Sequence, residues 1–96
     1  MSSTRRRSLS YIRLAAWLAG QPTELTSIEM SLEEIEDLLG RTLPDGARWP
    51  SWWRNDQRRL HSRAWLLAGW EIAEVHVDRR RVVFARRPEP DSVRPR

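Results

Sequence analysis

Residues 49–70, WPSWWRNDQRRLHSRAWLLAGW, contain five of the six tryptophans of the chain and decide how the rest is interpreted. Four apolar positions in this stretch follow the i, i+4, i+7, i+8 spacing of a helix that buries one face: Leu60, Ala64, Leu67 and Ala68. The pattern therefore predicts a helix over about residues 57–68. Gly69 is placed to end it, because glycine adopts a left-handed backbone without steric cost.

The polar residues of this helix are expected to face away from the core. Arg58, Arg59 and Ser62 fall off the apolar stripe. Arg63 lies closer to the stripe, so it is either an exposed contact or a packing residue whose charged head reaches solvent.

The tryptophans are predicted to serve mainly in packing, since one indole can bury on the order of 200 Å². Trp65 lies opposite the stripe and can pack against the Trp52–Trp53 loop or the C-terminal hairpin. A cage for a base or a cation is the alternative, and aromatics among arginines also suit single-stranded nucleic acid.

Length and composition limit the class of protein. The 96 residues predict one small domain. The absence of cysteine excludes disulfides and thiolate metal sites. No apolar run reaches the roughly 18 residues of a membrane helix, and no signal-peptide apolar region follows the early arginines, so a soluble cytoplasmic protein is expected.

Charge is distributed in blocks. All 17 basic residues are arginine, a bias that a GC-rich genome also produces. The net charge is +4 over residues 1–20, −6 over 21–47 and +6 over 48–87. Such segregation predicts one acidic and one basic surface, and the basic surface would attract polyanions. Plain solubility is the alternative explanation.

The segments before residue 49 supply an arm, two helices and a strand. Residues 1–8, which include Arg5, Arg6 and Arg7, are predicted to form a flexible basic arm that can follow a DNA groove. A first helix is expected over about 9–19 and a strand over 25–30. Ser31 and Glu34 have the spacing of a capping box, which predicts a second helix over 32–39 that Gly40 ends. Its acidic outer face is expected to be solvated.

The segment after Gly69 is predicted to be a β-hairpin. Strands are expected over 71–77 and 81–86, with a bulge near Ala73 and a turn at residues 78–80. Residues 88–96 contain three prolines and no apolar cluster, which predicts a disordered tail. The folded domain is then 9–87.

The order α-β-α-α-β-β predicts an α+β fold of the winged helix-turn-helix type, with three helices and a small antiparallel sheet. In such a domain the third helix typically lies in the major groove. Phosphate contacts set register and base-edge contacts read sequence, and arginine serves both purposes. We therefore expect double-stranded DNA as the partner, contacted by Arg54, Asn55, Gln57, Arg58, Arg59, Ser62 and Arg63 and, on the wing, by Arg79, Arg80 and Arg81.

The role expected of such a protein is that of a small transcriptional regulator or a nucleoid-associated factor. Tight binding by so small a surface would require a homodimer or tandem binding. The alternative is a protein-interaction module on the same fold, antitoxin-like or an accessory subunit, that uses the acidic second helix or the tryptophan loop.

An enzyme is not expected. The sequence offers no nucleophile–base pair, no glycine-rich phosphate loop and no cluster of metal ligands. His61 and His76 are single histidines without ligand partners at metal spacing. No cofactor or metal is therefore predicted.

Two tryptophan motifs resemble those of a known family. The loop Trp52-Trp-Arg-Asn-Asp56 and the helix end Ala64-Trp-Leu-Leu-Ala-Gly-Trp70 are similar to a group of small, uncharacterised bacterial domains, as are residues 31–40 and Leu43-Pro44. The resemblance covers about residues 10–86. It implies one shared fold but no assigned activity.

Overall fold

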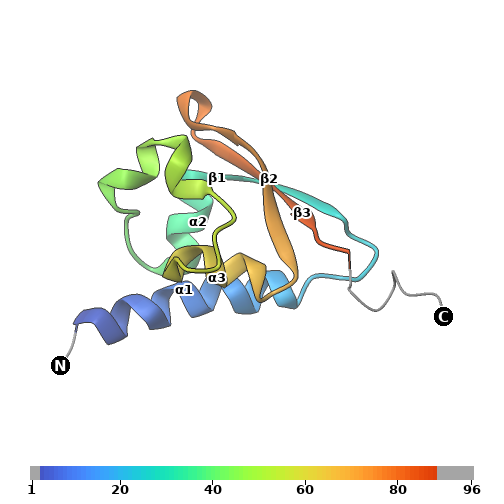
Figure 1. Cartoon of the computed structure of the whole chain (residues 1–96), viewed down its shortest axis with the longest axis horizontal. Helices are drawn as coiled ribbons and strands as arrows, with labels where there is room; N and C mark the ends of the chain where they lie inside the picture. Colours follow the sequence, from blue (N-terminus) through green and yellow to red (C-terminus); the bar gives the residue numbers. More distant parts are fainter. Residues whose placement is uncertain (1–2, 89–96) are drawn as a thin grey trace.

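The described residues form three α-helices and one three-stranded antiparallel sheet in the predicted order (Figure 1). The computed structural model describes the backbone of residues 3–88 and the side chains of residues 11–88. The helices are α1 (Ser3–Ala19), α2 (Leu32–Leu39) and α3 (Leu60–Leu66), and the strands are β1 (Ser27–Ser31), β2 (Trp70–His76) and β3 (Arg81–Arg86). Short 3₁₀ turns cover Asp45–Arg48 (η1), Pro50–Trp53 (η2) and Val77–Arg79 (η3). The predicted α+β class is confirmed.

The sheet has β3 at its centre, in the order β1-β3-β2. Phe84 on β3 lies opposite Ile28 on β1 and Ile72 on β2, and it is fully buried. The pairing of β2 with β3 shifts between Ile72 and Glu74, which confirms the bulge predicted near Ala73. The hairpin turn ends at Arg80, the one non-glycine residue in the described chain with a positive φ, 56°.

Helix α2 begins and ends where its local sequence predicts. The Ser31 hydroxyl accepts a hydrogen bond from the Glu34 amide at 3.0 Å, and the Glu34 carboxylate accepts one from the Ser31 amide at 2.8 Å. Gly40 ends the helix with φ 77°.

The core is built around tryptophan. Trp53, Trp65 and Trp70 are buried together with Phe84 and with the α1 residues Leu14 and Leu18. The Trp70 indole N–H donates to the Leu18 carbonyl at 3.0 Å, so the deepest indole is also hydrogen-bonded. Helix α1 packs against both α2 and α3 (Figure 1).

The prediction for α3 is wrong in length and in orientation. The helix covers Leu60–Leu66 rather than 57–68. Asp56 accepts from the Arg58 amide at 3.0 Å, a local turn that competes with a helical start at residue 57. Leu60 and Leu67, predicted to be buried, are 43% and 83% exposed, while Ser62, Trp65 and Leu66 are buried. Burial of the large Trp65 indole, rather than the leucine spacing, sets the orientation of the helix.

The N-terminal boundary also differs from the prediction. Helix α1 begins at Ser3, so residues 3–8 continue this helix instead of forming a separate arm. The side chains of Arg5, Arg6 and Arg7 and the predicted tail beyond Pro88 lie outside the described residues.

Candidate nucleic-acid interface

The arginine-rich stretch follows a long connection between α2 and α3 that is held by side-chain hydrogen bonds. The Trp53 indole N–H donates to the Ala47 carbonyl at 2.9 Å. The Trp52 ring stacks on His61 with centroids 3.8 Å apart and planes 2° apart, and a His61 ring nitrogen lies 2.7 Å from the Trp52 carbonyl. These contacts join η2 to α3 and give the intervening loop a defined conformation.

Asn55 connects this loop to α3 and to the sheet. Its side-chain oxygen accepts from the Trp65 indole N–H at 2.9 Å and from the Ile72 amide at 2.8 Å. Its amide nitrogen donates to the Ile72 carbonyl at 3.0 Å. Trp65 in turn stacks on Trp53 and meets Phe84 edge-on, as expected if it packs against the tryptophan loop. The loop motif therefore has a structural role.

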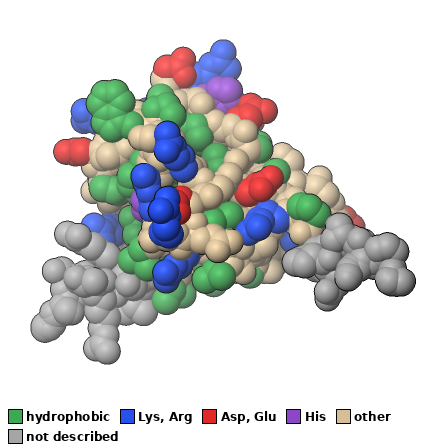
Figure 2. All heavy atoms as spheres, in the orientation of Figure 1, with side chains coloured by type: hydrophobic (Ala, Val, Ile, Leu, Met, Phe, Trp, Pro, Cys, Tyr) green, Lys and Arg blue, Asp and Glu red, His purple; other side chains and the backbone are tan. Residues whose placement is uncertain are grey.

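Four arginines lie over this frame within ten residues: Arg54, Arg58, Arg59 and Arg63. Arg54, Arg58 and Arg63 are exposed and Arg59 is half-buried. Figure 2 shows basic side chains gathered on one face, over the loop that precedes α3. Arg59 donates to the Ser51 carbonyl at 3.0 Å and Arg63 donates to the Gln57 carbonyl at 2.9 Å, so two of the guanidinium groups are held in place by the backbone.

One carboxylate interrupts the basic stretch. Asp56 accepts from the Arg58 guanidinium at 3.0 and 3.1 Å and lies 3.7 Å from Arg59. The hydrogen bonds from Arg58 lower the pKa of Asp56 to about 2. The same pairing raises the pKa of Arg58 above its ordinary value. Arg54 makes no side-chain hydrogen bond or ion pair with the described residues.

Arg87 adds a fifth charge to this surface. It lines a hollow of about 380 Å³ together with Gln57 and Arg63. Sequence reasoning missed Arg87 because it follows β3 and lies far from α3 along the chain. Pairing of β3 with β2, which follows α3 directly, brings it there.

Ser62 and Asn55 do not present their polar groups as the sequence predicted. Ser62 is completely buried and donates to the Arg54 carbonyl at 2.7 Å, so its predicted place on an exposed reading face is wrong. The amide group of Asn55 is engaged by Trp65 and Ile72. Gln57 is exposed.

The hairpin tip is separate from this surface. It lies at the opposite end of the molecule from α3 (Figure 1). Arg80 pairs with Glu33 of α2, and Arg81 pairs with Glu29 of β1 at 2.7 Å. Arg79 is exposed and has no such partner among the described residues. The predicted joint action of the wing and the third helix requires the hairpin tip and α3 to lie close together, and they do not.

Trp49 departs from the predicted packing role. It is 66% exposed and lies between Arg48, also exposed, and the η2 turn. An exposed indole can stack on a base or pack against a partner.

His61 lies half-buried beside the Trp52 ring. Burial, the largest effect, lowers the pKa of His61 below its ordinary value of 6.5, which favours a neutral ring stacked on Trp52. Among the described residues, His, Asp and Glu form no group able to hold a metal ion. No helix in the described part of the chain is long and apolar enough to cross a membrane.

Most of the chain matches the model of a known protein family. Residues 11–88 match a family model described as "Domain of unknown function (DUF7662)", in agreement with the predicted resemblance to a small uncharacterised family. Neither a curated protein nor a solved structure matches the chain.

Proposed function

The chain belongs to the DUF7662 family of domains of unknown function, and we propose that it binds double-stranded DNA through the arginines of residues 54–63. The observation that carries this proposal is the exposure of three of these four arginines, Arg54, Arg58 and Arg63, with Asp56 as the only carboxylate in the stretch. Arginine donates bidentate hydrogen bonds to phosphate and keeps its charge at any physiological pH. Arg87 extends the same surface.

The fold supports this proposal in part. The element order and the sheet order β1-β3-β2 are compatible with the predicted winged helix, which supports the proposal. Two features depart from a recognition-helix mechanism: α3 has only 7 residues, and four of them are buried. We therefore propose that contact is mainly to the phosphate backbone, made by the loop before α3 and by the exposed Arg63. Such contacts fix position and carry little sequence information.

This mode of contact favours a nucleoid-associated factor over a regulator that reads a long site. A surface of this size buries roughly 600–1,000 Å² of protein on DNA and binds modestly as a monomer. The proposed role as a nucleoid-associated factor, with its location at the nucleoid, follows from the proposal that the chain binds DNA.

A homodimer would double the footprint, and one groove supports it. The described chain has five exposed large apolar side chains, and three of them, Ile12, Leu60 and Leu67, line a groove of about 210 Å³ between α1 and α3. Exposed apolar patches of this kind mark interaction sites. Arg63 lines the groove and also belongs to the basic stretch. Two copies joined here would bring their basic stretches together.

The test is the salt dependence of binding to a random-sequence duplex. Each phosphate neutralised contributes about −0.9 to the slope of log affinity against log salt concentration. The Arg54 side chain makes no hydrogen bond or ion pair with the described residues, so Arg54→Gln should weaken binding and reduce the slope by about 1 without affecting the fold. Arg41→Gln is the matched control, because Arg41 is exposed and lies outside this surface. Binding that is absent at low salt, or equal effects of both variants, would refute the proposal.

A further inference from the structure

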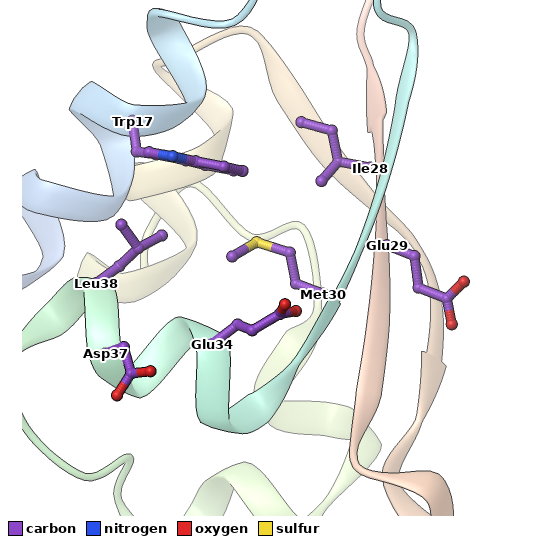
Figure 3. Close-up of a pocket in the computed structure, with 7 residues that line it drawn as sticks. All are labelled: Trp17, Ile28, Glu29, Met30, Glu34, Asp37 and Leu38. Carbon is purple, nitrogen blue, oxygen red and sulfur yellow. The ribbon is translucent and has the colours of Figure 1, made fainter.

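Another cleft lies between α1, β1 and α2, and the charged residues that line it are acidic rather than basic. It has a volume of about 370 Å³, in the lower part of the range of ligand sites. Figure 3 shows the Trp17 ring extending over the cleft, with Met30 projecting into it between Leu38 and Ile28. None of these residues belongs to the proposed DNA surface.

The local geometry explains how apolar and acidic groups come together here. Ile28 and Met30 lie on the same face of β1, since alternate residues of a strand share a face. Glu34, Asp37 and Leu38 have the i, i+3, i+4 spacing that places side chains on one face of α2. Met30 is only 5% exposed and lies deep, whereas Glu34 and Asp37 are exposed at the edge. The cleft thus has an apolar floor and an acidic rim.

The carboxylates at this rim are available to a ligand. Asp37 makes no hydrogen bond or ion pair with the described residues. Glu34 uses one oxygen to accept from the Ser31 amide, which leaves the other oxygen. Glu29 also lines the cleft, but Figure 3 shows its side chain pointing away, and it pairs with Arg81. Among the side chains that the structure describes, no lysine or arginine lines the cleft.

We propose that this cleft binds a basic, amphipathic segment of a protein partner. An apolar side chain of the segment inserts between Trp17 and Met30, and a flanking lysine or arginine pairs with Asp37 and Glu34. The indole face attracts a nearby cation, and the flexible methionine side chain adapts to the shape of the inserted group. The acidic rim selects against a partner of negative charge. This inference does not rest on DNA binding.

The side chain of Met30 provides a specific reporter. The chain has two methionines, Met1 and Met30, so methyl-¹³C-methionine labelling of the full chain gives two NMR signals. Met30 lines the cleft together with Trp17 (Figure 3), so its methyl signal should respond to any group that enters the cleft. A synthetic amphipathic peptide of leucine and lysine is the probe, and its leucine–glutamate analogue is the charge control. Both are titrated at about 0.15 M salt to suppress long-range attraction.

The expected result is a saturable shift of the Met30 signal with the lysine peptide, and at least a tenfold weaker effect of the glutamate peptide. Asp37→Asn should weaken binding roughly two- to fivefold, the range of an exposed ion pair. Asp45→Asn, the same chemical change at an exposed site outside the cleft, should leave affinity unchanged. Trp17→Leu should abolish the shift, with far-UV circular dichroism as the check on folding.

Four outcomes would overturn the proposal. The Met30 signal does not move, or both peptides move it equally, or Asp37→Asn and Asp45→Asn weaken binding to the same degree. A free alkylammonium ion that binds as tightly as the lysine peptide would also overturn it, because the site would then be one for small amines. DNA binding is measured separately on the same variants, so the two proposals fail independently.

Discussion

The indole N–H of Trp65 donates to the side-chain oxygen of Asn55 over 2.9 Å, and this contact ties the arginine-bearing loop to α3. The same oxygen accepts from the first strand of the hairpin, so one amide side chain joins the loop, the helix and the sheet. The proposed DNA surface lies directly over this junction. Its arginines are consequently presented by a loop that hydrogen bonds of Asn55 join to the helix and to the sheet.

Asn55→Ala should therefore destabilise the fold. The change leaves the Trp65 indole N–H, on a residue only 1% exposed, and the Ile72 amide without their acceptor. An unsatisfied buried donor costs about 1–3 kcal/mol of the free energy of unfolding. Urea unfolding measures the loss. Gln57→Ala is the control, since Gln57 is exposed two residues away, and equal destabilisation by both variants would contradict this role for Asn55.

Where structure is set by neighbouring residues, the sequence was sufficient to predict it. The capping box of Ser31 and Glu34, with Gly40 at the other end, determines α2 through contacts a few residues apart. The bulge at Ala73 follows from a change in alternation along one strand. Each of these features has a local physical cause, and each was located correctly.

Where structure depends on contacts between distant residues, the prediction from the sequence was wrong. The orientation of α3 is set by Trp65, whose burial needs Trp53 and Phe84 at positions that spacing within the helix cannot reveal. The leucines of the helix gave a plausible but wrong stripe. The candidate sites show the same division. The arginines of 54–63 were evident from composition. Only the tertiary structure brings Arg87 next to Arg63, and only the tertiary structure forms the separate cleft between Trp17 and Met30.

The stability of the protein should decrease as the pH falls below the ordinary pKa of histidine. Burial lowers the pKa of His61 below 6.5 in the folded state, so the unfolded chain binds a proton at higher pH than the folded chain does. Unfolding therefore takes up a proton in this range. The urea midpoint should fall between about pH 7 and pH 5, and His61→Gln should flatten that dependence. His76→Gln removes the other histidine, and a flattening by that variant instead would contradict the assignment.

Asp56→Asn should increase affinity for DNA. The pKa of Asp56, about 2 in the presence of Arg58, keeps the carboxylate charged at every pH at which DNA binding is practicable, so substitution is the way to remove its charge. Loss of the carboxylate frees the Arg58 guanidinium for a phosphate. The salt slope should become steeper by about 0.9, the contribution of one added phosphate contact. Fluorescence anisotropy with a labelled duplex measures both quantities, and Asp78→Asn, at the distant hairpin turn, should change neither.

Leu67→Ser should dissociate the proposed homodimer without unfolding the chain, because Leu67 is 83% exposed and makes little contribution to the core. The groove between α1 and α3 is mainly apolar, but Arg63 also lines it. In a dimer joined at this groove, the Arg63 side chains of the two copies would approach each other and repel. Salt screens that repulsion, so the dimer should become tighter as salt rises, whereas DNA binding weakens. Sedimentation equilibrium at low and high salt measures the change.

Leu25→Ser is the matched control, since Leu25 is 38% exposed and lies outside the groove. A monomer at all salt concentrations, or a dimer that Leu67→Ser leaves intact, would rule out this interface.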